Sequence, residues 1–210
     1  MCFHSQHTAN AQALKNRFKA RFQEEIKFSP SNEVNGFTHP YLPIVTNEEP
    51  NALQLYQWGL LPQWAKDEKF QQNTLNAKLE TIAEKPSFKA VEFQRCLIPA
   101  TGFYEWKWLD GKGKSKEKYL IQVENSPIFC FAGLWSKWID PLSGILRGTY
   151  TILTTEANPL MAEIHNSKKR MPVILDVSAE EEWLLGKNPP KITTQLIAES
   201  LEPPMQFSLF

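Results

Sequence analysis

A single carboxylate among three aromatic residues is the feature of this sequence most suggestive of chemistry. Glu105 lies in the run Phe103-Tyr104-Glu105-Trp106, shortly after the apolar run Cys96–Pro99 and a break at Gly102. Aromatic neighbours solvate an anion poorly, so they favour the protonated carboxyl group and raise its pKa. A glutamate in such surroundings can serve as a general acid or base near neutral pH. The alternative is an outward-facing glutamate on a strand whose alternate residues point into the core.

The second residue is a cysteine, and removal of Met1 would turn Cys2 into a 1,2-aminothiol. The α-amine has a pKa near ~8 and the thiol near ~8.5, so both are partly nucleophilic at neutral pH. This pair condenses with an aldehyde to an imine, which the thiol then closes to a thiazolidine ring. A terminal cysteine can also act as an acyl-transfer nucleophile with its own amine as base. Taken alone, however, position 2 is more simply interpreted as a frayed end.

Two other positions could assist such chemistry. His165 follows an expected helix and precedes a basic loop, which suits proton transfer near neutral pH and suits a cap on the helix dipole equally well. Asn76 could position an amine or a carbonyl while Lys78, two residues on, meets a phosphate. By itself, Asn76 would indicate no more than the start of a helix.

Aromatic and basic residues outside these positions could contact a nucleic acid. Trp64 and Phe70 fall in a polar connecting segment, where aromatics either anchor a satellite core or stack on bases. The segment 110–115 has strong turn chemistry and predicts a hairpin tip. The densest positive charge in the chain is found at this tip, on Lys112, Lys114, Lys116 and Lys118.

Apolar periodicity predicts the elements that must position these residues. We expect helices over residues 8–26, 85–93, 156–164 and 178–185, the first capped by Thr8 and the last by Ser178. We expect strands near 44–45 and over 53–62, 96–99, 103–106, 119–123, 128–134, 149–154 and 171–175. The proline-containing tail from about residue 188 is expected to wrap the surface.

Length and composition indicate one domain over residues 1–210, since no segment shows the composition shift of a linker. Lysine plus arginine and aspartate plus glutamate both number 23, so no global field draws the chain to a polyanion, and any such site must be a local patch. The three cysteines and four histidines show no metal-ligand spacing. With no signal peptide and no membrane span, we expect a cytoplasmic protein that needs no metal or other cofactor and is a monomer.

Several sequence blocks, taken in order, resemble the SOS-response-associated peptidase (SRAP) family of abasic-site processing proteins. The resemblance covers nearly the whole chain, and its central block is specific. The blocks are Cys2, Trp58–Trp64, Asn76–Thr81, Arg95–Trp106, Phe131–Trp135, Ile164-His165 and Arg170–Pro172.

The resemblance implies an α+β fold with a barrel-like, mostly antiparallel β core flanked by helices, and a groove for single-stranded DNA. It implies that Cys2, freed of Met1, attacks the ring-opened aldehyde of an abasic site and forms a stable thiazolidine DNA–protein crosslink. Asn76 would hold the terminal residue and the sugar, Glu105 would assist proton transfers at the Cys2 amine, and His165 would open the sugar. Self-cleavage of the initiator peptide, β-elimination at the abasic site and association with the nucleoid DNA are also implied.

DNA contacts are expected from a local set of side chains. Lys78, Lys168, Lys169 and Arg170 are the candidates for phosphates, and Trp64 and Phe70 are the candidates for stacking. Two departures from the family pattern stand out. Phe3-His4 follow Cys2 where the family usually has Gly-Arg, and Lys78 stands where many members have arginine.

Two other functions fit parts of the sequence. An amidase or protease with an N-terminal cysteine nucleophile would hydrolyse a small amide. A non-catalytic module for single-stranded DNA would keep its affinity after Cys2→Ala and would form no covalent product.

Overall fold

The strand β7 (Arg95–Ala100) lies at the centre of the molecule, since all its residues are buried. The computed structural model describes residues 2–187 and 194–202. Within it, Cys96 and Ile98 pack into one apolar cluster, while Leu97 packs into another on the opposite face of the strand. A strand covered on both faces is apolar at successive positions, as the sequence predicted here.

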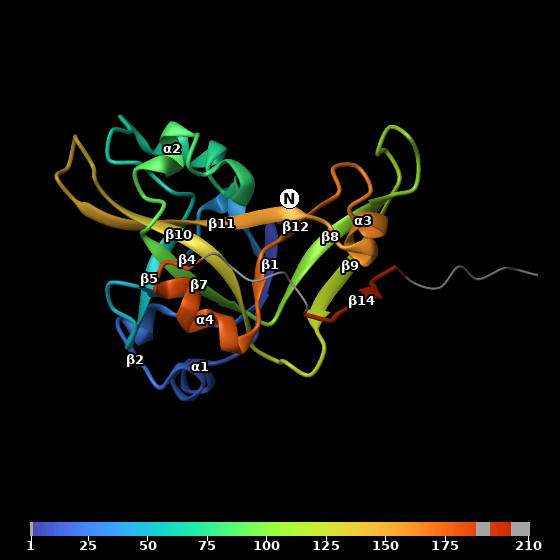
Figure 1. The fold of residues 1–210 in the computed structure, drawn as a ribbon, viewed down its shortest axis with the longest axis horizontal. Helices are drawn as coiled ribbons and strands as arrows, with labels where there is room; N and C mark the ends of the chain where they lie inside the picture. Colours follow the sequence, from blue (N-terminus) through green and yellow to red (C-terminus); the bar gives the residue numbers. More distant parts are fainter. Residues whose placement is uncertain (1, 188–193, 203–210) are drawn as a thin grey trace, which may run out of the picture.

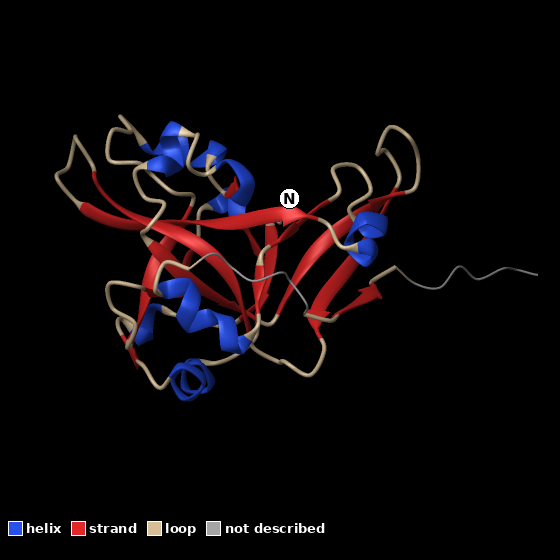
Figure 2. Ribbon diagram, viewed as in Figure 1, coloured by secondary structure: helices blue, strands red, loops and turns tan. Residues whose placement is uncertain are grey.

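The strands form two sheets that share a core (Figures 1 and 2). The five-stranded sheet is antiparallel and has the order β14 (Leu196–Ser200), β9 (Lys116–Val123), β8 (Gly102–Trp108), β1 (His4–His7) and β3 (Ser31–Asn35). The main path of the nine-stranded sheet is β12 (Arg170–Pro172), β11 (Leu146–Glu156), β10 (Phe129–Ile139), β7, β4 (Tyr41–Thr46), β5 (Ala52–Trp58) and β2 (Arg21–Phe22). Beside this path, β6 (Asn76–Lys78) pairs in parallel with β11, and β13 (Ile174–Leu175) pairs with β10.

The helices are short and lie around the sheets (Figure 2). They are α1 (Ala11–Phe18), α2 (Pro86–Lys89), α3 (Pro159–Ile164) and α4 (Val177–Leu184), with 3-10 turns η1 (Glu25–Lys27), η2 (Gly36–Thr38), η3 (Glu68–Asn73) and η4 (Leu79–Thr81). Leu14, Phe88 and Trp183 belong to the cluster that covers one face of the nine-stranded sheet. Helix α3 lies instead beside β8.

A second apolar cluster fills the space between the two sheets. It joins Phe103 and Ile121 of the five-stranded sheet to Phe131, Tyr150 and Ile152 of the nine-stranded sheet. The molecule is therefore an α+β protein with a barrel-like, mostly antiparallel β core flanked by helices, as expected.

The chain passes from one sheet to the other at Thr101-Gly102, which confirms the bend that Gly102 predicted. β7 pairs with β10 in the nine-stranded sheet up to Ala100. In the five-stranded sheet, β8 pairs with β1 from Gly102 and with β9 from Phe103. A Cβ atom on Gly102 would lie 2.9 Å from Leu120 Cδ1 and 3.2 Å from the Ile121 carbonyl oxygen. Only a glycine at this position lets β8 and β9 approach this closely.

The predicted helix over 8–26 is wrong in length. α1 begins after Asn10, whose side chain accepts from the Ala13 N–H at 2.8 Å, so Asn10 and not Thr8 is the N-cap. It ends at Phe18, and the C-cap residue Lys19 adopts a left-handed conformation with φ 49°. The following residues form β2, because pairing with β5 overrides the helical periodicity of Phe22.

Other element boundaries also differ from prediction. β5 stops at Trp58 because Gly59 turns the chain with φ +113°. α3 starts at Pro159, where Asn158 caps it, and α4 starts after Asp176, ahead of the predicted cap at Ser178. The segment 171–175 is split into β12 and β13, which pair with different strands.

The hairpin tip over 110–115 is confirmed between β8 and β9. Part of the predicted surface tail, residues 188–193 and 203–210, lies outside the described residues. Residues 196–200 form β14, an edge strand paired with β9. No helix in the described part of the chain has the length and apolar character needed to cross a membrane.

Candidate active site

Glu105 lies in β8 with its side chain turned into the core, and only 4% of it is exposed. Burial raises its pKa to about 7, although a hydrogen bond with the Trp106 backbone partly opposes the rise. The environment inferred from the aromatic neighbours is therefore present. A carboxyl group with this pKa can both accept and return a proton at neutral pH.

Cys2 leads into β1 and is fully buried in the cluster between the sheets. Its thiol lies 3.7 Å from the His4 carbonyl oxygen. Burial raises the pKa of this thiol well above its ordinary value, and the nearby charge of Glu105 adds to the effect. The thiol is therefore held neutral, and its activation requires transfer of its proton to a neighbouring base.

Asn76 fixes the backbone beside the thiol. Its position in β6 is set by the parallel pairing with Ile152 of β11, so it lies in a strand and does not start a helix. The Asn76 side-chain N–H donates to the Cys2 carbonyl oxygen at 2.9 Å. Its Oδ1 atom is buried and accepts no hydrogen bond within the described residues, which leaves one acceptor for a donor group of a ligand.

His165 follows the last residue of α3 and is 6% exposed. Its Nδ1 lies 2.7 Å from the Arg170 carbonyl oxygen and 3.3 Å from the Arg170 backbone nitrogen. Since a carbonyl can only accept, the shorter contact favours the tautomer in which Nδ1 carries the proton and Nε2 is the basic nitrogen. Burial is the main cause that lowers the pKa of His165. The ring is therefore neutral at physiological pH.

Asn166 attaches the loop after His165 to the edge of β8. Its Oδ1 accepts from the Trp108 backbone N–H at 3.1 Å, and its Nδ2 donates to the Trp108 carbonyl at 2.9 Å. At the other end of the loop, Arg170 makes two hydrogen bonds to the Glu80 carboxylate, of 3.0 and 2.8 Å. These attachments hold His165 against the strand that carries Glu105.

Glu105 and His165 line the same cleft, which has a volume of about 410 Å³. Its other lining residues are mainly aromatic and basic: Phe3, His4, Phe37, Trp106, Trp108, Lys116, Ser167 and Lys168. Cys2 adjoins this cleft through Phe3 and through its electrostatic contact with Glu105. The structure therefore gathers Cys2, Asn76, Glu105 and His165 from four separate elements.

The residues predicted to contact DNA are only partly gathered there. Lys168 lines the cleft, and Lys78 and Lys169 are exposed. Arg170, by contrast, is engaged by Glu80 and by the Thr154 carbonyl oxygen at 2.7 Å, so its guanidinium stabilises the loop.

Trp64 and Phe70 do not line the cleft. Their rings contact each other edge to face, with centroids 5.0 Å apart, and Phe70 packs on the small cluster of Leu61, Ala65 and Trp138. Trp64 remains 54% exposed. Of the two sequence interpretations, the satellite-core anchor describes Phe70 better.

Sequence reasoning missed the cleft's own aromatic walls. Phe3 and Phe37 face each other with centroids 4.8 Å apart, and Trp106 and Trp108 come from β8. The alternation of aromatics at 106 and 108, opposite lysines at 118 and 116, was the available signal.

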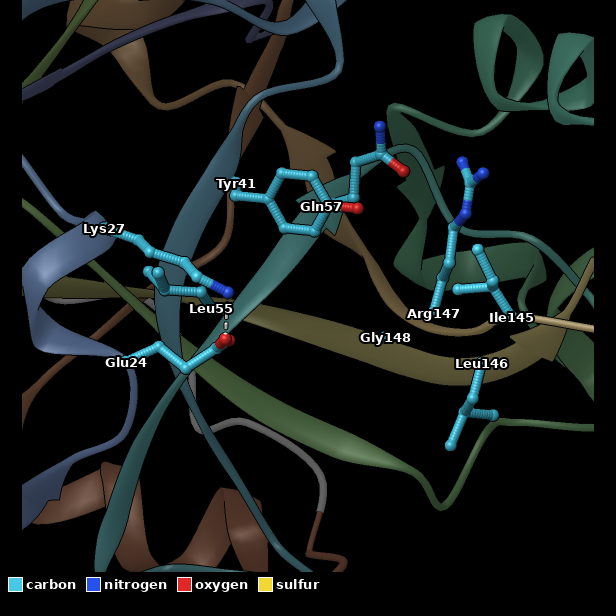
Figure 3. Close-up of a pocket in the computed structure, with 9 residues that line it drawn as sticks. All are labelled: Glu24, Lys27, Tyr41, Leu55, Gln57, Ile145, Leu146, Arg147 and Gly148. Carbon is cyan, nitrogen blue, oxygen red and sulfur yellow. Dashed lines mark hydrogen bonds and ion pairs between the residues drawn. The ribbon is translucent and has the colours of Figure 1, made fainter.

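A larger hollow of about 780 Å³ lies elsewhere, between β4, β5 and β11 (Figure 3). Its lining residues are Glu24, Lys27, Tyr41, Leu55, Gln57, Ile145, Leu146, Arg147 and Gly148. It includes none of the four predicted catalytic residues, and its Lys27 ammonium is paired with Glu24. Among the described residues, no three His, Cys, Asp or Glu side chains gather as metal ligands would.

These observations define an α+β protein in which a buried cysteine at position 2 adjoins a near-neutral carboxyl group and a carboxamide, next to a cleft that a histidine also lines. The chain belongs to the SOS response associated peptidase (SRAP) family, whose model matches residues 1–208.

Relatives of known name and structure agree with this assignment. The abasic site processing protein YoqW of Bacillus subtilis is 45% identical over 169 residues, covering 80% of this chain and 72% of that protein. The abasic site processing protein HMCES of Xenopus tropicalis is 33% identical over 167 residues, covering 70% of this chain and 49% of that protein.

Solved structures share the fold. A crystal structure of a Bacteroides thetaiotaomicron protein has a TM-score of 0.87 at 33% identity, covering 96% of this chain and 92% of that chain. A Bordetella bronchiseptica protein has a TM-score of 0.76 at 22% identity, covering 96% and 100%.

Proposed function

We propose that this chain processes abasic sites in single-stranded DNA by forming a thiazolidine crosslink through Cys2 after Met1 is removed. The observation that carries the proposal is the burial of the Glu105 carboxyl group, with a pKa raised to about 7, in electrostatic contact with the buried Cys2 thiol. The names of the relatives support abasic sites as the target.

The reaction joins the two nucleophiles of Cys2 to one carbon. The α-amine adds to the C1′ aldehyde of the opened sugar, and loss of water gives an imine. The thiol sulfur then adds to the same carbon while its proton passes to the imine nitrogen. The net reaction joins the protein to the aldehyde with the loss of one water molecule.

Glu105 is the proton carrier for these steps. Because its pKa is raised to about 7, a large fraction is ionised at neutral pH and can take a proton from the amine or the thiol. The protonated acid then returns this proton to the departing hydroxyl group. The buried thiol needs this help, since its own pKa is raised.

Asn76 and His165 prepare the reactants. The hydrogen bond from Asn76 to the Cys2 carbonyl fixes the backbone that carries the amine, and its unpartnered Oδ1 can accept from a sugar hydroxyl or the freed amine. The basic Nε2 of His165 accepts the proton of the C1′ hydroxyl, and the resulting acid protonates the ring oxygen, which opens the sugar.

Two further activities belong to the proposal. In the first, hydrolysis of the Met1–Cys2 bond by this acid–base group would be a self-processing step that exposes the amine. In the second, an imine at C1′ acidifies the neighbouring C2′ hydrogen, and removal of that proton expels the 3′ phosphate in a lyase reaction. DNA phosphates would meet Lys78, Lys168 and Lys169.

Intact mass spectrometry tests the proposal. The Met1-processed protein, incubated with single-stranded DNA carrying one abasic site, should yield a species equal to protein plus DNA minus one water. Cys2→Ala, in which the thiol is absent, should give no product that survives heating, and neither should DNA with all bases present. A heat-stable adduct on another residue would contradict the assignment of Cys2.

A further inference from the structure

We propose that Trp108 and Lys116 form a subsite for the nucleotide that flanks the abasic sugar, with its base on the indole and its phosphate on the ammonium group. This inference rests on the proposed function, and it assigns a role to the β8–β9 hairpin that the crosslinking chemistry leaves unused.

The first observation is the position of the pair. Trp108 and Lys116 are directly opposite each other in the β8–β9 register, and both line the cleft that holds Glu105 and His165. The Lys116 ammonium lies 5.5 Å from the centre of the Trp108 ring. A nucleotide next to the reacting sugar in this cleft therefore meets an aromatic ring and a cation together.

The second observation is that Trp108 is held rigidly. Its backbone N–H and C=O are both bonded by Asn166, and a Cβ atom on Gly113 would lie 2.6 Å from the indole, so the hairpin tip packs directly against the ring. An aromatic ring fixed before binding loses little conformational entropy when a base stacks on it.

The third observation concerns charge. In the described part of the chain Lys116 makes no ion pair, whereas its neighbour Lys118 is paired with Glu33 and Lys107 with Glu163. Lys116 is also exposed. Its charge is thus available to a phosphate, in a chain whose net charge is zero.

Two more aromatic residues line the same cleft. Phe3 and Phe37 are in contact with each other, and Phe37 is 51% exposed. Stacking is tolerant of sequence because every base has an aromatic face. Such a subsite would read the presence of a flanking base and not its identity.

The test is a double-mutant-type cycle, in which Trp108 and the bases that flank the abasic site are removed separately and together. Binding is measured by fluorescence anisotropy on single-stranded DNA with a tetrahydrofuran abasic analogue, which has no aldehyde and cannot crosslink. A second oligonucleotide lacks the two bases beside the analogue as well. Trp108→Ala should weaken binding to the first at least about fivefold and leave binding to the second nearly unchanged.

Matched variants separate stacking from folding. Trp108→Phe should restore most of the affinity, and Phe93→Ala, an exposed aromatic outside the cleft, should have no effect. Lys116→Ala should reduce the slope of log affinity against log salt by about 0.7, while Lys112→Ala on the same hairpin should not.

Equal losses on both oligonucleotides, or no loss on either, would overturn the subsite. Crosslinking to true abasic DNA at saturating concentration is measured beside these assays. Its absence would count against the proposed function, whereas normal crosslinking with no base-dependent loss would count against the subsite alone.

Discussion

At the scale of single residues, Glu105 links folding to chemistry. Its pKa is raised from 4.5 to about 7 by burial, so the folded state holds the proton more tightly than the unfolded state. The resulting stability is fully present below pH 4.5 and is lost as the pH rises through 7. Glu105→Gln mimics the protonated carboxyl group and should be more stable than the native chain at pH 8, by about 3 kcal/mol. Urea unfolding at pH 4.5 and pH 8 measures this, and an equal difference at both values would refute it.

The same ionisation should govern the reaction. At saturating abasic DNA, the crosslinking rate of the native chain should rise with pH through about 7, as the Glu105 carboxylate forms. The crosslinking rate of Glu105→Gln should be lower by ~10²-fold or more, and it should no longer rise with pH through this range. Single-turnover rates from pH 5.5 to 8.5 provide the measurement. If the rate of this variant still rises with pH through about 7, another group is the base.

Asn76 offers a test of positioning. Asn76→Asp replaces the N–H that bonds the Cys2 carbonyl with an oxygen, so the backbone of Cys2 is repelled instead of held. We expect the crosslinking rate at saturating DNA to fall by ~10²-fold, with a smaller change in affinity for the tetrahydrofuran analogue. Asn73→Ala, exposed on η3, is the control. Unchanged kinetics in Asn76→Asp would remove the residue from the site.

At the scale of elements, the loop between α3 and β12 is held by Asn166, which bonds both backbone groups of Trp108. Asn166→Ala should free His165 from its buried position. The His165 limb of the pH–rate profile should then move upward, toward the ordinary histidine pKa, because burial is the main cause of its lowering. The loss in unfolding free energy should be ~1–2 kcal/mol. If the rate falls without movement of that limb, Asn166 has only a structural role.

The elements also show what the sequence could predict. The buried strand β7, the turn at Gly102 and the aromatic environment of Glu105 depend on neighbouring residues, and local patterns predicted them. The helix over 8–26 was predicted too long because pairing of Phe22 with β5 is a long-range contact that periodicity does not encode.

The arrangement of the site also depends on long-range contacts that local sequence patterns do not encode. Cys2 reaches Glu105 through the pairing of β1 with β8, and Asn76 reaches Cys2 through the parallel pairing of β6 with β11. Residue type and family resemblance predicted these members. The ion pair of Arg170 with Glu80 and the aromatic walls of the cleft depend on tertiary packing, and they could not be predicted from local spacing.

At the scale of the whole molecule, zero net charge limits how DNA is held. The cations proposed for phosphates are Lys78, Lys116, Lys168 and Lys169, which predicts a slope of log affinity against log salt of about −3 for single-stranded DNA. Fluorescence anisotropy titrations between roughly 50 and 300 mM salt measure this slope. A much steeper slope would mean that phosphates contact more cations than these four.

Covalent capture of an abasic site by Cys2 is the step on which the proposed function depends. Denaturing gel electrophoresis of the Met1-processed protein with single-stranded abasic DNA tests it most directly, with Cys2→Ala and an intact-base oligonucleotide run beside it. We predict a heat-stable shifted band that requires both Cys2 and the abasic site. No band from a chain whose Met1 is confirmed absent, or an equal band from Cys2→Ala, would contradict the account.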